Sequence, residues 1–388
     1  MTAPRYSSID MLAKLISFDT TSRNSNLELI HFVQAYLGDH GVGSELVHDA
    51  TGQKANLWAT IGPQGDGGVV LSGHTDVVPV DGQPWTSDPW TLTDKGDGRL
   101  YGRGTCDMKT FSAVALAMLP DFLKAGLKSP IHLALSYDEE VGCIGVHGLI
   151  DLIKANGVKP RLAVIGEPTM MRVVDAHKSI RSYYVTVTGH EAHSSNVHKG
   201  VSAVMVAAEL IGKLAEIGAD LSRVGDASGR FDPPYSTCVV NTIGGGTAQN
   251  ILARECTFTY ELRGLPGADM EKVAARFADH ALNAVLPRLR IVAPAADIEI
   301  RQRAMSPPLT AAPGSDAESF VMALAERNAA EAVSYATEAG IFQEAGIPAI
   351  VCGPGDIAQA HQPDEFIDAA QIPLCEAFMR RLVGKLAA

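Results

Sequence analysis

The sequence is poor in cysteine, and its cysteines lack the spacing of a structural framework. Only 6 of the 388 residues are cysteines, and they are widely scattered with no C-x-x-C pair. This pattern argues against a disulfide scaffold and against a zinc site built from cysteines. We expect reduced, mostly buried thiols.

Long hydrophobic runs are also missing. No segment approaches the roughly 20 consecutive apolar residues of a membrane-spanning helix. Residues 1–22 have no uninterrupted apolar core behind a basic start, as a secretion signal would. We therefore expect a cytoplasmic protein with no membrane partner.

Basic residues are fewer than acidic ones. The sequence has 32 Lys and Arg against 44 Asp and Glu, which gives a formal net charge of −12. Such a balance opposes attraction to phosphate backbones, so nucleic acid is not an expected partner. The sequence has no G-x-S-x-G motif and no P-loop, and its glycines at 102–104 and 142–145 miss the full G-x-G-x-x-G pattern. Serine-hydrolase, ATP and dinucleotide chemistry are therefore disfavoured.

What is present is typical of a two-domain α/β enzyme: 46% hydrophobic residues, 37 glycines and 21 prolines. Short apolar runs alternate with segments of helical spacing, which predicts a mainly parallel sheet with helices on both faces. The predicted strands are 56–61, 68–73, 131–137 and 161–165, and the predicted helices are 8–17, 27–37 and 109–127.

The pattern changes near residue 180 to the order β-α-β-β-α-β, which matches a ferredoxin-like α+β arrangement. Its predicted strands are 180–188, 236–243, 255–265 and 298–303, and its helices 200–217 and 270–289. We therefore expect a first domain made of residues 1–179 and 306–388, with residues 180–305 inserted into it. Segments 335–340, 349–353 and 372–386 would complete the first domain.

Acidic and histidine residues follow the predicted strands, where ligands gather in parallel sheets. His74 and Asp76 are two residues apart, which puts both side chains on one face of an extended chain. A metal-binding histidine oriented by a carboxylate fits this spacing, and so do ordinary turn hydrogen bonds.

Carboxylates gather at two further points. Asp107 follows a glycine-punctuated turn and precedes a helix, where it could be held at a site or simply favour the helix dipole. Asp138, Glu139 and Glu140 end a predicted strand; they would repel one another unless solvated or neutralised by a cation. Glu139 and Glu140 cannot point the same way, so one could bind metal while the other faces a substrate.

Glu167 and His361 complete the set. Two histidines with several carboxylates, and no thiolate, suit two divalent ions that share a bridging carboxylate, activate a water and polarise a carbonyl.

Five ordered motifs resemble one enzyme family collinearly over nearly the whole chain: 72–79, 102–109, 138–140, 166–169 and a late histidine. The family is that of the dinuclear zinc hydrolases, which includes deacetylases, desuccinylases, aminoacylases and glutamate-releasing carboxypeptidases. The resemblance implies a zinc-peptidase-like fold and two Zn²⁺ ions, for which Co²⁺ could substitute.

Carried over position by position, the resemblance implies a role for each polar residue. Asp107 would bridge the two ions, Asp76 would be the partner of His74, and Glu139 would be the general base. The remaining ligands would be His74 and Glu167 for one ion, and Glu140 and His361 for the other.

The inserted domain carries two further similar segments, 189–195 and 244–250. They imply that His193 polarises the substrate carbonyl in a partner subunit's site, and that Asn250 and Arg263 bind the substrate carboxylate. A tight turn and a strand-edge arginine are the alternative interpretation of the last two. His190 and His198 are interpreted as surface or structural residues, and the domain as the interface of a homodimer.

Segments 176–178, 353–356 and 359–365 look most like the branch that hydrolyses N2-acetylornithine to ornithine and acetate, a step of arginine biosynthesis. Cys106, Gly340 and Ile341 depart from that pattern, so the acyl and side-chain specificity stays open. The alternatives are a desuccinylase, a general aminoacylase or a dipeptidase, each taking a small N-acyl amino acid or peptide. A non-catalytic dimeric binding protein is a remote alternative, because it has no chemical need for Glu139.

Overall fold

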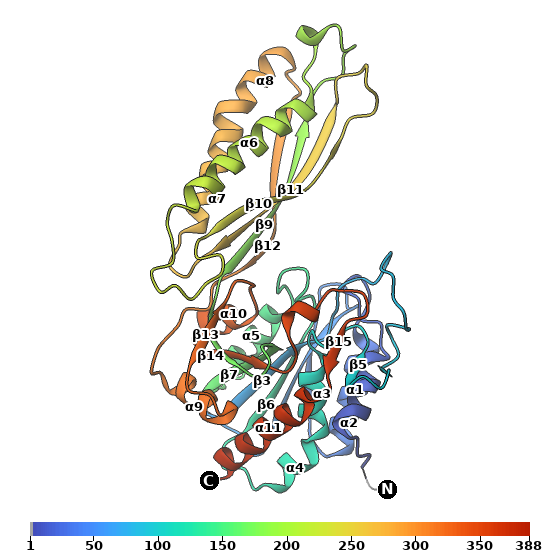
Figure 1. The fold of residues 1–388 in the computed structure, drawn as a ribbon, viewed down its shortest axis with the longest axis vertical. Helices are drawn as coiled ribbons and strands as arrows, with labels where there is room; N and C mark the ends of the chain where they lie inside the picture. Colours follow the sequence, from blue (N-terminus) through green and yellow to red (C-terminus); the bar gives the residue numbers. More distant parts are fainter. Residues whose placement is uncertain (1–2) are drawn as a thin grey trace. The chain divides into compact units, whose positions relative to one another are not determined.

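The computed structural model describes residues 3–388, which divide into two compact units (Figure 1). The first unit consists of residues 3–176, Leu309–Ala332 and Thr337–Ala388, and the second of His177–Pro308 with Val333–Ala336. The segment 333–336 joins the second unit, where Ser334 Oγ donates to the backbone oxygen of Asp232 (2.5 Å).

The first unit is built on an eight-stranded mixed sheet with the order β1-β2-β6-β3-β7-β14-β8-β13. The central neighbours β6, β3, β7 and β14 run parallel, whereas the pairs β1–β2, β2–β6 and β14–β8 are antiparallel. The strands are β1 Ser44–His48, β2 Ala55–Ile61, β3 Val69–His74, β6 Ile131–Ser136, β7 Leu162–Pro168, β8 Val173–His177, β13 Ala330–Val333 and β14 Ala349–Gly353.

Helices cover both faces of this sheet. One face packs against α1 Ser8–Ile16, α2 Leu27–Asp39, α3 Lys109–Ala117, α4 Leu119–Lys124, α9 Asp316–Ala325 and α11 Gln371–Ala387, around one large apolar core. The other face is covered by α5 Val146–Ala155 and α10 Ala339–Glu344. Strands buried on both faces need continuous apolar runs, as β3 and β7 have. The predicted α/β fold class is confirmed.

The helix expected at 109–127 is two helices. The chain bends at Met118 between α3 and α4, and Pro120 occupies the first turn of α4. Proline has no N–H to donate to the carbonyl four residues earlier, so it ends one helix and is tolerated at the start of the next.

A small antiparallel sheet was not predicted. It pairs β15 Phe366–Asp368 with β5 Arg99–Tyr101, and β5 with β4 Thr93–Asp94. These strands are too short and irregular in hydrophobicity to give a sequence signal. The sheet brings the turn before α3 beside the loop that follows η3 Ile357–Gln359.

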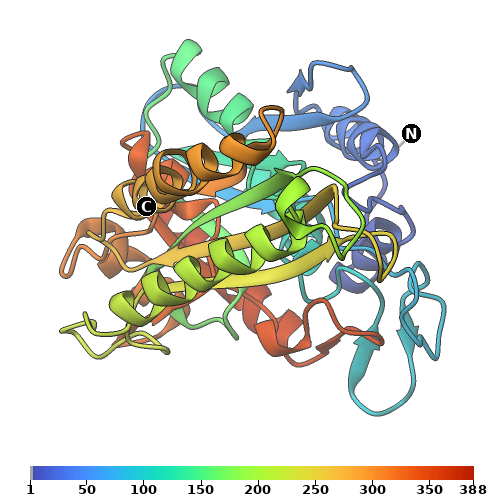
Figure 2. The ribbon, with the colours of Figure 1, turned by 90° about the horizontal axis from the view of Figure 1, so that it is seen from above.

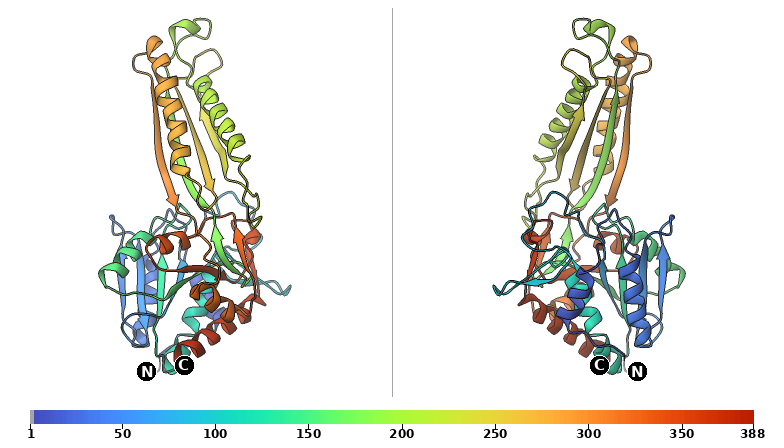
Figure 3. Two further views of the ribbon diagram at one scale, coloured as in Figure 1. Left: turned by 90° about the vertical axis from the view of Figure 1, so that its left-hand side faces the viewer. Right: turned by 90° about the vertical axis from the view of Figure 1, so that its right-hand side faces the viewer.

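The second unit is a four-stranded antiparallel sheet with the order β10-β11-β9-β12 and helices on one face (Figures 2 and 3). Its strands are β9 Ser179–Thr188, β10 Thr237–Gly245, β11 Glu255–Gly264 and β12 Asp297–Ser306. Along β9 and β11, buried residues alternate with more exposed ones, as expected for a sheet that packs on one side only. This topology is the predicted ferredoxin-like one.

Helices α6 Ala203–Leu221, α7 Met270–Asp279 and α8 Leu286–Val292 cover the packed face, and η1 Val197–Lys199 precedes α6. The predicted helix at 270–289 is interrupted by the π-helical turn η2 His280–Val285. Pro287, at the start of α8, explains the interruption because it cannot donate to the preceding turn. Among residues 3–388, no helix is both long enough and apolar enough to cross a membrane.

Candidate metal centre

Parallel strands of the first unit deliver three of the predicted ligands to one edge of its sheet. His74 is the last residue of β3, and Glu167 is the next-to-last residue of β7, which pairs with β3. Glu140 follows β6, whose last residue Ser136 is in register with His74. The carboxyl ends of parallel strands meet at one edge, so these side chains come together.

Asp107 and His361 reach the same place from loops. Asp107 lies two residues before α3, and His361 lies between η3 and β15 with a left-handed backbone (φ 63°). The Nε2 atom of His74 lies 3.0 Å from Oδ1 of Asp107, and the Nε2 atom of His361 lies 3.3 Å from Oδ2. Each oxygen of Asp107 therefore faces a different histidine.

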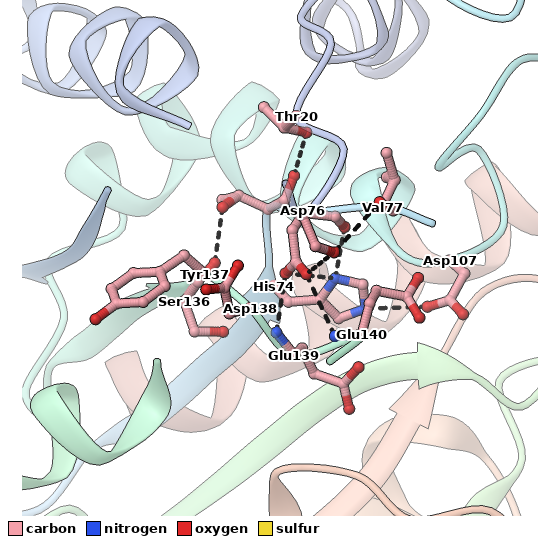
Figure 4. A network of polar contacts seen from close by, with 12 residues as sticks. Thr20, His74, Asp76, Val77, Asp107, Ser136, Tyr137, Asp138, Glu139 and Glu140 are labelled. Carbon is pink, nitrogen blue, oxygen red and sulfur yellow. Dashed lines mark hydrogen bonds and ion pairs between the residues drawn. The ribbon is translucent and has the colours of Figure 1, made fainter. Parts of the chain in front are cut away.

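Two other carboxylates flank this pair. Glu140 Oε2 is 3.0 Å from Nε2 of His361, and Glu167 Oε1 is 3.7 Å from Nε2 of His74. Figure 4 shows the His74 ring beside Asp107, with Glu139 and Glu140 close to it. The structure thus brings together all five predicted ligands and the predicted base.

The potential ligand atoms that lie close together do not form quite the same sets as the predicted ligands. Ligand atoms within 4.8 Å of one another form two triads, one of His74, Glu139 and Glu167, and one of His74, Asp107 and Glu140. Glu139 therefore stands as close to the first position as a ligand would. The division into ligands and base remains a prediction.

Burial makes this cluster electrostatically costly. It raises the pKa of Glu139 to about 8 and that of Glu140 to about 7, reinforced by the neighbouring carboxylates. Burial likewise raises the pKa of Glu167. Divalent cations relieve such a cluster, and imidazole with carboxylate oxygen is a donor set that suits them. The residues present therefore fit a metal-binding site.

The pKa values of the two histidines are raised as well, which favours the charged form of a histidine. Hydrogen bonds to Asp107 and Glu140 raise the pKa of His361 to about 10. Burial disfavours the charged form of His74, but the Asp107 hydrogen bond and nearby carboxylates outweigh it and raise the pKa. Burial would raise the pKa of Asp107, yet its hydrogen bonds to His361 and His74 lower it.

Asp76 supports the cluster in a different way from the one predicted. The Nδ1 atom of His74 is 2.9 Å from the backbone oxygen of Asp76 and 3.7 Å from its carboxylate, so the carbonyl is the closer acceptor. The carboxylate instead accepts the backbone N–H groups of Glu139 (3.0 Å) and Glu140 (3.3 Å) and the hydroxyl of Ser22 (2.7 Å). Asp76 therefore holds the histidine with its backbone and the two glutamates with its side chain.

Asp138 turns away from its two neighbours. It forms an ion pair with Lys54, which is distant in sequence but adjacent in the fold. Of the three adjacent carboxylates expected to repel one another, Asp138 is thus neutralised by Lys54, from the segment before β2.

Sequence reasoning missed three buried charged residues around the cluster. Glu338 accepts hydrogen bonds from Ser72 and Ser136, and burial raises its pKa to about 7. Arg103 and Glu365 form an ion pair with a 2.6 Å contact, each side chain 1% exposed. A charged residue surrounded by glycine or loop residues gives little sequence signal, because its burial depends on contacts distant in the chain.

The remaining predicted residues lie in the second unit. His193 is exposed, and its Nδ1 lies 2.8 Å from Oγ of Ser195. The backbone N–H of Ser194, next to it, donates to the backbone oxygen of Asn250 (2.9 Å). Arg263 lies near the end of β11, where it forms an ion pair with Glu261 (2.6 Å). The structure thus brings His193 near Asn250 within this unit, while their part in a reaction remains a prediction.

Comparisons with known proteins place this geometry in a family. A model of "Peptidase family M20/M25/M40" matches residues 70–385. The chain belongs to this peptidase family. It is accordingly a metal-dependent hydrolase, as predicted.

Curated relatives include an acetylornithine deacetylase of Myxococcus xanthus, 36% identical over 96% of both chains. Another, of Proteus mirabilis, is 35% identical over 94% of this chain and 91% of the relative. The fold is similar to that of an M20 family metallo-carboxypeptidase from Sulfolobus solfataricus, with a TM-score of 0.79, 18% identity and coverage of 98% and 99%.

The electrostatic cost predicts how the stability of the metal-free protein depends on pH. Glu139 and Glu140 have folded pKa values raised above the ordinary 4.5, so the folded state binds protons that the unfolded chain releases between about pH 4.5 and 8. The contribution of His361, whose pKa is raised from 6.5 to about 10, is lost as pH rises between about 6.5 and 10. Both effects make the folded state less stable at higher pH.

We therefore expect the melting temperature of the chelator-treated protein to be lower at pH 8.5 than at pH 6.5, by about 3 °C or more. Saturating Zn²⁺ should remove most of this difference, and Glu139→Gln combined with Glu140→Gln should flatten the profile without metal. A melting temperature that rises with pH would contradict the repulsion described here. Differential scanning calorimetry at both pH values measures it.

Proposed function

We propose that the chain hydrolyses the amide bond of N-acyl amino acids, with N2-acetylornithine as the substrate and ornithine and acetate as the products. The observation that carries this proposal is the placement of two histidines on opposite oxygens of Asp107, within a buried group of glutamates. The curated relatives named acetylornithine deacetylase supply the choice of substrate.

Two Zn²⁺ ions are the proposed cofactor. Asp107 would be shared, His74 and Glu167 would hold one ion, and Glu140 and His361 the other. When bound, such ions polarise a carbonyl and lower the pKa of water, so that it can attack at neutral pH.

Glu139 is the proposed general base. Without metal, burial and the neighbouring carboxylates raise its pKa to about 8. Bound cations would oppose this rise and bring the pKa closer to neutrality, where a group can take up and return a proton. Its backbone N–H donates to Asp76, and Sγ of Cys143 lies 3.2 Å from its Oε1. Glu139 would take the proton of the attacking water and pass it to the leaving amine.

A homodimer is part of the proposal, with His193 stabilising the oxyanion in the partner subunit's site and Asn250 and Arg263 binding the substrate carboxylate. The edge strand β10 supports a second copy as the partner. Val239 and Ile243 on this strand are 49% and 56% exposed, and Met205 on α6 is 71% exposed. An unpaired strand edge with apolar neighbours favours pairing with another chain.

A cytoplasmic location also belongs to the proposal. None of the six cysteines forms a disulfide in the described chain, which agrees with a reducing compartment.

The substrate is tested with protein stripped of metal by a chelator. Release of free amine is measured from N2-acetylornithine, acetyl-methionine and succinyl-diaminopimelate, with and without added Zn²⁺ or Co²⁺. We expect metal-dependent turnover that favours acetylornithine by at least about tenfold in kcat/KM, equivalent to about 1.4 kcal/mol. Preference for another substrate would retain the metal chemistry and reject acetylornithine. Lack of turnover on all three by metal-loaded protein would contradict the proposed activity.

The separate roles of Glu139 and Glu140 are tested by paired substitutions. Glu139→Gln should keep both ions and lose about 100- to 10,000-fold in kcat, because general-base catalysis contributes that much. Glu140→Gln is the matched control and should lose bound metal as well as activity. Metal content by mass spectrometry and steady-state kinetics distinguish the two. Substantial activity in Glu139→Gln would exclude it as the base.

Sharing of sites across a dimer is tested by mixing two inactive variants. His193→Ala and Glu139→Gln subunits are unfolded together, refolded as a mixture and assayed. The refolded mixture should regain about a quarter of the wild-type rate, because random pairing makes half of the dimers mixed and each mixed dimer has one intact site of two. No recovery, despite dimers in sedimentation analysis, would argue against action in the partner's site.

A further inference from the structure

Arg103 is a buried arginine that touches neither predicted ion position. Its guanidinium donates to Oε2 of Glu365 (2.6 Å) and to Oε1 of Gln83 (2.5 Å), and it lies over the ring of Trp85 at 5.1 Å. A buried charge is tolerated only when it is paired and hydrogen-bonded. The guanidinium also donates to the backbone oxygens of Gln362 (3.3 Å) and Pro79 (3.5 Å). Arg103 therefore joins the segment of Glu365 to that of Gln83.

The first segment reaches Asp107. The other oxygen of Glu365, Oε1, accepts the backbone N–H groups of Gly104 (3.1 Å), Cys106 (2.8 Å) and Asp107 (3.1 Å). One carboxylate oxygen thus gathers the turn that presents Asp107. Gly104 permits this turn with φ of +84°, where a Cβ atom would meet Val77 at 2.9 Å.

The second segment reaches His361. Oε1 of Gln83 accepts hydrogen bonds from the Arg103 guanidinium and from the indole N–H of Trp85 (3.0 Å). Its Nε2 donates to the backbone oxygen of His361 (3.0 Å). The side chain of His361 is 49% exposed and its residue lies in a loop. Gln83 therefore ties an otherwise exposed loop to the buried arginine.

Together these contacts form a closed ring of residues. From Asp107 they run through Glu365, Arg103 and Gln83 to His361, whose ring returns to Asp107 at 3.3 Å. His74 and Glu167 are not in this ring, since they stand on paired strands β3 and β7 and are held by the sheet. The two halves of the site thus have different supports.

We propose that Gln83, Arg103 and Glu365 are positioning residues that hold His361 and Asp107 in register, and so set the affinity of the ion position that these ligands form with Glu140. The other position shares Asp107, but its other two ligands, His74 and Glu167, are held by the sheet. Gln83 contacts only the His361 side of this network, so its loss should spare that position. This inference rests on the proposed set of two ions.

The test is calorimetric titration of the metal-free protein with Zn²⁺, together with metal analysis. Wild-type protein should bind two ions. Gln83→Leu should keep one at wild-type affinity and bind the other about 10- to 100-fold more weakly, the usual cost of losing a group that orients a ligand. Excess Zn²⁺ should restore kcat with KM unchanged.

Two further variants separate positioning from general damage. Gln83→Glu keeps the acceptor for Arg103 and Trp85 but loses the donor to His361, so it should weaken the same ion if Gln83→Leu does not fold. Gln343→Leu is the matched control: Gln343 ties a loop of the same unit through the backbone N–H and oxygen of Thr310, both at 2.9 Å. It should leave both affinities unchanged.

The affected position is identified in a His361→Ala background, in which Gln83→Leu should not change binding of the remaining ion. The inference would be overturned if Gln83→Leu weakened the binding of both ions equally, or if neither Gln83 variant changed the binding of either ion. It would also be overturned if Gln83→Leu weakened the binding of the ion that remains in His361→Ala. A wild-type protein that binds a single ion would overturn the proposed two-ion set and this inference together.

Discussion

Mutual repulsion among buried carboxylates, offset by two histidines, is the constraint on which the first unit depends. Glu139, Glu140 and Glu167 are all held where burial raises their pKa. Within this cluster, Asp107 instead has a lowered pKa, because each of its oxygens contacts a histidine. A protein that keeps such a group together needs cations to bind there, and its fold must supply supports that resist the repulsion.

Those supports are of two kinds. β3 and β7 place His74 and Glu167 by main-chain pairing, which tolerates little displacement. Loops place Asp107 and His361, and polar side chains fix the loops, with Glu365 accepting three backbone N–H groups. Asp76 links the two kinds of support. It directly follows the residue after β3, and its carboxylate accepts the backbone N–H groups of Glu139 and Glu140 in the next loop. The positions of the ligands therefore depend on these hydrogen bonds as well as on the strands that carry His74 and Glu167.

The second unit has a different organisation. Its core lies between one face of a four-stranded sheet and three helices, leaving the other face and the β10 edge open. His193 and Asn250 lie on adjacent loop segments of this unit. The sheet of this unit presents these loops and the edge strand β10, while the proposed metal ligands all belong to the first unit.

The sequence by itself determined the fold class, the family and the residue types of the metal centre. Apolar periodicity shows whether a strand is buried on one face or two, and strand ends locate His74, Glu140 and Glu167. Tertiary structure alone decided which atoms meet. The acceptor for His74 is the backbone of Asp76, Lys54 neutralises Asp138, and Arg103 and Glu365 pair inside the protein. Such contacts join residues far apart in the chain, so their energies depend on burial and distance, which no local pattern of residues contains.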